Sequence, residues 1–281
     1  MGWATKWWGR RTRWQQFLLL LVVALAVYFA YTLTRPSVEE SAVFTIPIGG
    51  GDDEFRAPGR DPAWSPDGNT IAFTSQDEED VETVFTFEIA DGAVAGLAPG
   101  GAPAWSPDGS TLAVAAENEA GVSEIYLVDV ANGEATLLTE GNHPAWSPDG
   151  TTIAYDLTDA DGATTVNLIV VATSEITPVT DGDEPNWKPD GSGMAIVRDN
   201  EDGTSEIYTV EVDGSGAELV TEGDDPSWSP DGTMIAFSAE EDDVSFVFTV
   251  VPGSEPVELV EGEAPGWSPE GDQITFTRIS D

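Results

Sequence analysis

The sequence contains no cysteine and only one histidine, His143, among its 281 residues. Without cysteine, a disulfide framework, a thiolate nucleophile and a thiolate metal site are all excluded. A single histidine cannot supply a multi-histidine metal site. Basic residues are also scarce, with 10 Lys and Arg against 52 Asp and Glu and a net charge of −42. This balance argues against nucleic acid as a partner, because phosphate binding requires clustered basic side chains.

The few basic residues are concentrated near the N-terminus. Half of them lie within the first 35 residues, flanking an uncharged run from Phe17 to Leu33. As a helix this run spans roughly 26 Å, close to the roughly 30 Å of a bilayer's hydrocarbon core. Aromatic residues lie near both of its ends, as is typical of a membrane interface. We predict a transmembrane helix over residues 14–35, preceded by a basic and aromatic cytoplasmic segment over residues 1–13.

The asymmetry of charge predicts the orientation of this anchor. The positive-inside rule places the N-terminus in the cytoplasm and the acidic remainder on the periplasmic or extracellular side. The sequence therefore predicts a single-pass protein of the cytoplasmic membrane, with residues 36–42 linking the anchor to a domain over residues 43–281. A cleaved signal peptide is the alternative. It requires a small-x-small cleavage site after the apolar core, which Ala30-Tyr31-Thr32 matches poorly.

A five-residue segment, Trp-Ser-Pro-Asp-Gly at residues 64–68, recurs along the rest of the chain, with substitutions in two of its six copies. Its tryptophans are separated by 41 residues in four intervals and by 39 in the fifth, and they are Trp64, Trp105, Trp146, Trp187, Trp228 and Trp267. Pro-Asp-Gly favours a tight reversal, because Pro fixes φ, Asp bonds locally and Gly accepts positive φ. A period close to 41 is typical of a four-stranded propeller blade. We expect the tryptophans to fill the wedges between blades as structural core residues.

The ends of the chain predict the number of blades. Five whole repeats lie between the first and last tryptophans. Residues 43–46 resemble the third strand of a repeat, and residues 273–277 resemble the second. Pairing of these two half-blades would close a ring and remove its exposed sheet edges. The sequence thus predicts an all-β fold, a six-bladed β-propeller of four-stranded antiparallel blades closed by its N- and C-terminal strands.

The repeated turns, the Ile-Ala-Phe strand at 71–73 and the Glu-Ile-Tyr strand at 124–126 resemble the TolB-type beta-propeller. The resemblance covers about residues 43 to 279. It implies the propeller fold. TolB itself binds the peptidoglycan-associated lipoprotein and carries an additional N-terminal domain, where this sequence has the predicted membrane helix. Related propellers precede the catalytic domains of prolyl peptidases.

One face of the predicted propeller is strongly acidic. The loops after the second and fourth strands share this face and hold more than half of the 52 acidic residues, opposed there by Arg60 and Arg198. These acidic residues have three possible roles. They keep the propeller soluble, particularly in a salt-adapted organism; they dock a basic protein surface; or they bind a cation such as Ca²⁺. The acidic loops at 159–162 and 199–203 do not match a twelve-residue calcium loop.

The residue before the first-strand proline of each blade is expected to surround the mouth of the central channel. Candidate binding residues at this position are Asp61, His143, Glu184 and Asp225. The last three fall on consecutive blades, and a histidine with two carboxylates is a donor set for a transition metal. With one such residue per blade, the side chains would lie far apart, which argues against this metal site. The alternative is that His143 is a loop residue that forms hydrogen bonds.

Catalytic signatures are weak throughout the sequence. No serine lies in a Gly-x-Ser-x-Gly elbow, and no Gly-x-x-x-x-Gly-Lys phosphate loop is present. Pairs of carboxylates are too common here to indicate a glycosidase. We therefore predict a non-enzymatic protein-binding scaffold or accessory subunit of a membrane complex, with a partner protein in or at the same membrane and no cofactor. A small-ligand or metal-binding sensor at the channel mouth, with Ca²⁺ or another cation, is the alternative, and a hydrolase is third.

Overall fold

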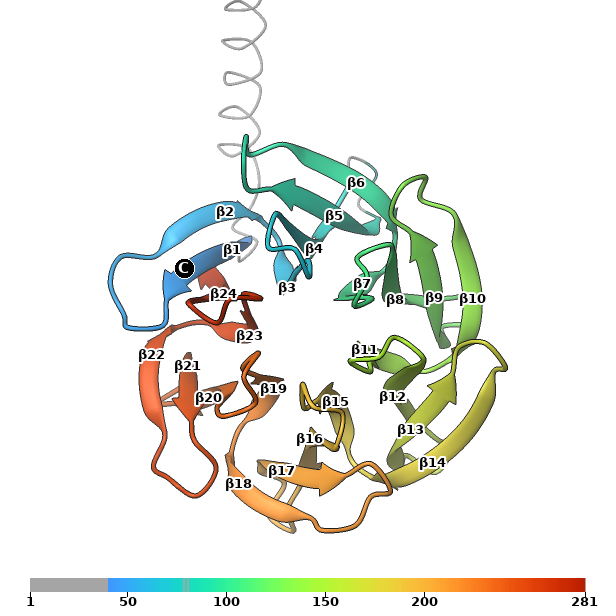
Figure 1. The fold of residues 1–281 in the computed structure, drawn as a ribbon, viewed down its shortest axis with the longest axis vertical. Coiled ribbons are helices and arrows are strands. Elements are labelled where there is room, and N and C mark those ends of the chain that lie inside the picture. Colours follow the sequence, from blue (N-terminus) through green and yellow to red (C-terminus); the bar gives the residue numbers. More distant parts are fainter. Residues whose placement is uncertain (1–39, 78, 80, 281) are drawn as a thin grey trace, which may run out of the picture. The chain divides into compact units, whose positions relative to one another are not determined.

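The computed structural model describes residues 40–77, 79 and 81–280 (Figure 1). Apart from Glu40, these residues belong to one compact unit, Ser41–Asp281. Within these ranges no helix has the length and apolar character needed to cross a membrane. The predicted anchor over 14–35, the segment 1–13 and most of the linker over 36–42 lie outside the described residues.

The described residues form six four-stranded antiparallel sheets arranged as blades around a central axis (Figure 1). The innermost strands, here called A, are β3 (Arg60–Trp64), β7 (Gly101–Trp105), β11 (Asn142–Trp146), β15 (Asp183–Trp187), β19 (Asp224–Trp228) and β23 (Glu263–Trp267). The B strands are β4 (Thr70–Gln76), β8 (Thr111–Glu117), β12 (Thr152–Thr158), β16 (Gly193–Asp199), β20 (Ile235–Glu241) and β24 (Gln273–Ser280).

The two outer positions of each blade complete the sheets. The C strands are β5 (Glu82–Glu88), β9 (Ser123–Asp129), β13 (Thr164–Val170), β17 (Ser205–Glu211), β21 (Val244–Val250) and β1 (Glu40–Pro47). The outermost D strands are β6 (Val94–Pro99), β10 (Ala135–Glu140), β14 (Glu175–Asp181), β18 (Glu218–Glu222), β22 (Val257–Glu261) and β2 (Glu54–Pro58). Blades 1 to 5 begin with β3, β7, β11, β15 and β19, and blade 6 begins with β23.

Blade 6 is assembled from both ends of the described chain. Its strand order is β2-β1-β24-β23, so that the first strand lies beside the last (Figure 1). The junction is packed with Ile46 from β1 against Trp267 and Phe276 from β23 and β24. Arg278 adds an ion pair with Asp53, 2.7 Å between Nη2 and Oδ2. The predicted six-bladed ring, closed by pairing of its terminal strands, is confirmed.

The hydrophobic core lies between the blades rather than within one sheet. Ile153 and Tyr155 of blade 3, for example, pack against Ala113 and Ile125 of blade 2, and all four are buried. The B strands supply most of this core because both of their faces are covered, which explains their continuous apolar runs. The D strands pack one side against the core, as Leu138 does in β10, and each exposes one large apolar residue, such as Leu137.

The repeated Trp-Ser-Pro-Asp-Gly segment is a structural element. In the first copy, the Ser65 hydroxyl donates to the Asp67 carboxylate at 2.7 Å, and Gly68 closes the turn with φ of 69°. The indole of Trp105 donates to the carbonyl of Ala63 in the preceding blade at 3.1 Å. The tryptophans of blades 4 and 6 form the same bond to their preceding blades. These contacts join neighbouring blades at the end opposite the acidic loops.

Candidate functional site: the channel mouth

The channel mouth is positioned by a repeated backbone conformation. Each D strand is joined to the next A strand by a single glycine with φ between 126° and 150°. At Gly223, an added Cβ would lie 2.5 Å from the carbonyl oxygen of Ser238, so that only glycine fits the turn. Two residues after each glycine, a non-glycine residue adopts left-handed φ between 43° and 52°. These six residues, the mouth ring, are Asp61, Ala102, His143, Glu184, Asp225 and Ala264.

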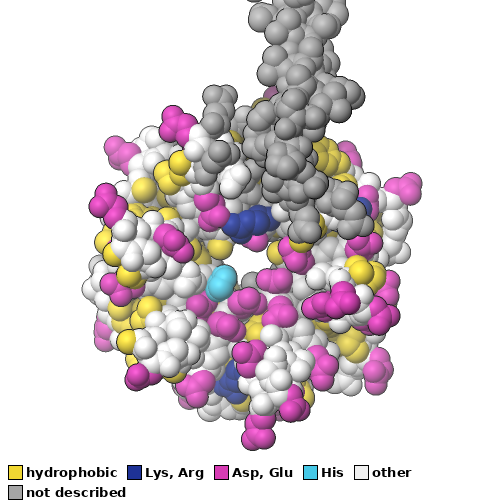
Figure 2. Space-filling view, turned by 180° about the vertical axis from the view of Figure 1, so that it is seen from behind, with side chains coloured by type: hydrophobic (Ala, Val, Ile, Leu, Met, Phe, Trp, Pro, Cys, Tyr) yellow, Lys and Arg dark blue, Asp and Glu magenta, His cyan; other side chains and the backbone are white. Residues whose placement is uncertain are grey.

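The mouth ring surrounds a central opening, and Figure 2 shows acidic side chains gathered around that opening with the single histidine at its edge. Left-handed backbone at a non-glycine residue is unfavourable and is retained where surrounding contacts fix it. The four candidate residues predicted from the sequence, Asp61, His143, Glu184 and Asp225, all lie in this ring.

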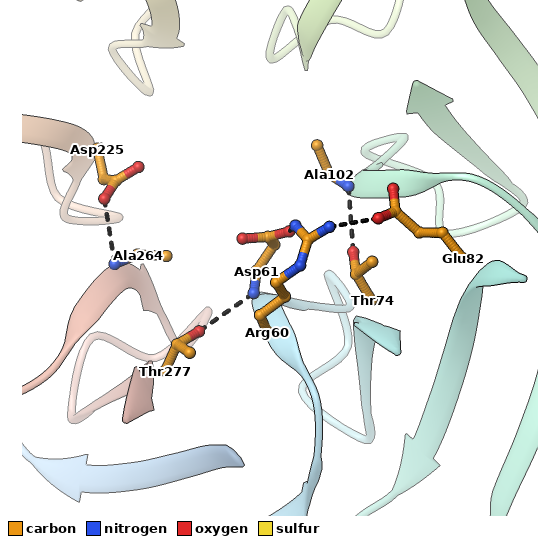
Figure 3. A network of polar contacts seen from close by, with 8 residues as sticks. All are labelled: Arg60, Asp61, Thr74, Glu82, Ala102, Asp225, Ala264 and Thr277. Atoms are coloured by element: carbon orange, nitrogen blue, oxygen red, sulfur yellow. Dashed lines mark hydrogen bonds and ion pairs between the residues drawn. The ribbon is translucent and has the colours of Figure 1, made fainter. Parts of the chain in front are cut away.

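Three joints between blades are fixed by hydroxyl groups. The hydroxyl oxygens of Thr74 and Thr277, both on B strands, accept hydrogen bonds from the backbone N–H of Ala102 and Asp61 in the next blade, at 3.2 Å and 3.1 Å (Figure 3). Ser238 accepts the N–H of Ala264 at 3.0 Å and donates to the Asp225 carboxylate at 2.9 Å. All three hydroxyl-bearing residues are buried, which makes these bonds hard for water to replace.

The remaining three joints have other residues at the same register position. This clamp position, opposite the residue that precedes the mouth ring, is occupied by Thr74, Ala115, Asp156, Val197, Ser238 and Thr277. Ala115 and Val197 offer no side-chain acceptor. Asp156 is 3% exposed, and its carboxylate lies 2.7 Å from Nδ1 of His143 in the same blade.

Glu184 replaces the missing clamp at the joint between blades 4 and 5. Its carboxylate accepts the backbone N–H of Asp225 at 2.8 Å. Burial and the charge of Asp225 raise the pKa of Glu184 from 4.5 to about 7. Asp61, across the mouth, also has a raised pKa, because burial outweighs the opposing effect of its ion pair with Arg60.

The imidazole of His143 is held in its charged form by its neighbours. Burial alone would lower the pKa of His143, but the hydrogen bond and charge of Asp156, with the charges of Glu184 and Asp183, raise it from 6.5 to about 9. The ring remains 49% exposed, so it is accessible from the opening. The buried Asp156 carboxylate is therefore compensated by the one histidine of the chain.

A second set of carboxylates lies next to the ring. This carboxylate row consists of Asp183, Asp224 and Glu263, each the residue before a ring position and each partly buried. Burial raises all three pKa values, and neighbouring acids raise them further; Asp183 reaches about 6. Arg60 faces this acidity and pairs with Asp61 and Glu82, and the charged His143 faces it from blade 3. The mouth is therefore acidic on most of its circumference.

The proposed transition-metal donor set is not assembled. No group of three or more His, Asp or Glu side chains in the described part of the chain could hold a metal ion. His143 instead bonds Asp156, and Glu184 bonds the backbone of Asp225. Asp156, Thr74 and Ser238 were not among the residues predicted from the sequence. Successive members of this set are separated by 82 residues, two repeats, which was the available signal, but this spacing identifies contact partners only when the strand register is known.

The acidic loops on this face are shaped by their own first residues. Asp77, Asn118, Asp159 and Asn200 each accept two backbone N–H groups from the loop that follows. These side chains are therefore used to form the turn. In the acidic loop at 159–162, the Asp159 carboxylate is used in this way.

Comparison with known proteins identifies relatives of the fold. The family model described as TolB beta propeller domain (PD40) matches residues 54–255. The structure of putative TolB from Agrobacterium tumefaciens is 23% identical with a TM-score of 0.74, covering 87% of this chain and all of that chain. TolB from Acinetobacter baumannii is 18% identical with a TM-score of 0.70, covering 88% of this chain and 71% of that chain.

Enzymes also share this fold. Oligogalacturonate lyase in complex with manganese is 13% identical with a TM-score of 0.57, covering 82% of this chain and 80% of that chain. At these identities the structural similarities define the fold alone. No curated protein matches the sequence.

Proposed function

Because the chain belongs to the TolB beta-propeller domain family, we propose that it is a non-enzymatic scaffold whose propeller binds another protein. Residues 14–35 would anchor it in the cytoplasmic membrane, with the propeller on the periplasmic or extracellular side. It would act there as an accessory subunit of a complex in or at the same membrane. The anchor and its orientation rest on the apolar run and on the positive-inside rule.

The observation that carries the proposal is the acidity of the channel mouth. The carboxylate row and the mouth ring place acids side by side at the cost of raised pKa values, although Arg60 and the charged His143 face them. A basic protein surface would relieve this repulsion and would be attracted from a distance. A rigid ring with exposed loops suits recognition, whereas the repeated Trp, Ser and Asp residues are used by turns and blade contacts.

The experiment is purification of the full chain from its native membrane in mild detergent, followed by mass spectrometry and crosslinking. We expect one membrane partner at fixed stoichiometry, crosslinked to the loops around the mouth. Neutralising the carboxylate row with Asp183→Asn, Asp224→Asn and Glu263→Gln should reduce recovery of the partner at least tenfold. These substitutions remove repelling charges and should not impair folding.

A matched control removes three charges from the outer surface. Glu175→Gln, Glu218→Gln and Glu258→Gln lie at exposed positions of β14, β18 and β22. This variant should retain the partner at the wild-type level. Recovery of a lone monomer, or equal loss of the partner in both triple variants, would contradict the proposal.

A further inference from the structure

An arginine of blade 4 fills the outer groove between blades 3 and 4. The guanidinium of Arg198 lies over the ring of Tyr208, with its Cζ 5.1 Å from the ring centroid. Its Nε donates to the carbonyl of Asp181, the last residue of β14 in blade 3, at 2.9 Å. The side chain therefore stacks on an aromatic ring of its own blade and bonds the backbone of the preceding blade. Stacking combined with directional N–H donation is characteristic of guanidinium recognition.

The groove between blades 5 and 6 is filled in the same way. Arg278, which like Arg198 directly follows the clamp position of its B strand, lies over the ring of Phe44 at 4.8 Å. Its Nε donates to the carbonyl of Glu261, the last residue of β22 in blade 5, at 3.2 Å. The fold thus forms a guanidinium site twice, and each time the chain supplies the arginine itself.

Blade 2 has an alanine where blades 4 and 6 have this arginine. The three blades alternate with the others around the ring (Figure 1). Ala116 follows the clamp position of β8 and pairs in register with Glu124 on β9. In blade 4 the corresponding pair is Arg198 with Glu206 on β17. Within the described part of the chain, no cation lies over the ring of Tyr126, which corresponds to Tyr208.

Most of the remaining contacts of the site are present in blade 2. The hydroxyl of Tyr126 donates to the Glu124 carboxylate at 2.6 Å, and the matching pair of blade 4 bonds at 2.7 Å. The carbonyl of Pro99, the last residue of β6, corresponds to the one that accepts from Nε of Arg198. The threonine hydroxyl that Arg198 also contacts is replaced by Ala98. The groove between blades 1 and 2 therefore retains the aromatic face and a backbone acceptor without the arginine.

The charges of the groove also match a cation. Glu124 lies directly opposite Glu140 in the pairing of β9 with β10, an arrangement of like charges that is unfavourable. Blade 4 has the same pair of acids, Glu206 and Glu222. There Arg198 is the neighbour of the pair on the adjoining strand and offsets its charge. In blade 2 the chain provides no such side chain at this position.

We propose that the groove between blades 1 and 2, here called the Tyr126 groove, binds an arginine side chain of a partner protein. The guanidinium stacks on Tyr126, accepts the negative charge of Glu124 and Glu140 as its counterpart, and donates to the carbonyl of Pro99. Leu137, which pairs with Tyr126 and is 53% exposed, provides an apolar contact for residues flanking that arginine. The use of the groove by a partner in the complex rests on the proposed function, whereas its affinity for a guanidinium does not.

The affinity can be measured with N-acetyl-arginine amide as the probe. The full chain in detergent, labelled at the tyrosine rings, is titrated and followed by NMR, and Tyr126→Phe identifies the Tyr126 signal. We expect a saturable shift of Tyr126 and none of Tyr208, whose ring Arg198 already covers. N-acetyl-lysine amide should bind at least about threefold more weakly, because an ammonium does not stack. Absence of a saturable Tyr126 shift, or equal affinity for the two amides, would overturn the proposal.

Two variants test the assignment by filling one groove and opening another. Ala116→Arg should occupy the Tyr126 groove and abolish the titration shift, and Arg198→Ala should make Tyr208 respond to the probe. The matched control is Thr136→Arg, which adds the same charge to blade 2 at an exposed position whose strand partner, Leu127, packs toward blade 3. This control should bind the probe as the wild type does.

Unchanged binding in Ala116→Arg, or equal loss in Ala116→Arg and Thr136→Arg, would refute the site even if Arg198→Ala fails to fold. Failure to find a membrane partner would contradict the proposed function and would leave these titrations unaffected.

Discussion

Glu184 accepts a hydrogen bond from the backbone N–H of Asp225, the residue at the same position of the next blade, at 2.8 Å. The two residues are 41 apart in the sequence, one repeat of the ring. Where three of the other joints use a buried hydroxyl from a B strand, this joint uses a side chain of the mouth ring itself. A single carboxylate thus both contributes to the charge of the mouth and connects two blades, so that the two properties cannot vary independently.

Restoring a hydroxyl at a joint that lacks one should stabilise the protein. Ala115 occupies the clamp position opposite Gly101 and offers no acceptor for the N–H of His143. Ala115→Thr would supply one in a β-strand, where threonine is favourable. We expect a gain of about 1 kcal/mol in the free energy of unfolding. Val197→Thr is the control, since the N–H of Asp225 at that joint is already bonded; it should give no gain. Urea unfolding at pH 7 measures both.

The tryptophans should differ in their contribution although their packing is alike. Trp105→Phe removes an indole N–H and leaves the carbonyl of Ala63 without that donor. The buried indole nitrogen of Trp146 has no hydrogen-bond partner among the described residues, so Trp146→Phe breaks no hydrogen bond there. Trp105→Phe should therefore be more destabilising by about 1 kcal/mol. Equal losses in chemical denaturation would show that the interblade bond contributes nothing.

Acid should destabilise the protein through its turns. Hydrogen bonds from the Ser110 backbone and the Ser106 hydroxyl lower the pKa of Asp108 from 3.8 to about 2, and those of Asp67, Asp149 and Asp231 are lowered in the same way. A carboxylate with a lowered pKa contributes stability above its unfolded value, and this is lost as the pH falls through the folded value.

The expected outcome is a fall in the urea midpoint between pH 4 and pH 2. Asp108→Asn should make the acid fall shallower, whereas Glu218→Gln on the exposed face of β18 should not. Stability that stays constant down to pH 2 would contradict the role of the turn carboxylates.

Salt should stabilise the propeller. At a net charge of −42 the compact state is opposed by self-repulsion. Raising NaCl shortens the Debye length from about 10 Å at 0.1 M to about 3 Å at 1 M, so the thermal midpoint should rise across this range. The triple variant Glu175→Gln, Glu218→Gln, Glu258→Gln should respond less than the wild type. A flat wild-type response would mean that the charges are compensated locally.

The fold was predictable because its signals are periodic and topological. The tryptophan spacing defines the repeat. Residues 43–46 resemble the third strand of a blade and residues 273–277 resemble the second, so one blade is complete only when these two segments pair. The candidate residues of the mouth were predictable because each precedes a proline at a fixed place in the repeat. The residues that contact these mouth residues could not be predicted. Asp156 pairs with Asn142, next to a register shift between β11 and β12, and its carboxylate contacts the following residue, His143. Such an offset has no signature in a single sequence.

The pairing of β1 with β24 also determines the order in which the blades can form while the chain is synthesised. Five sheets can form as they emerge, but the sixth lacks its inner half until residues 263–280 have been made. Until then β1 has no neighbour on one side, and its unpaired edge is open to other chains. Synthesis of β24 is therefore the step that allows the ring to close. Premature stop codons anywhere upstream should yield aggregation-prone products rather than smaller propellers.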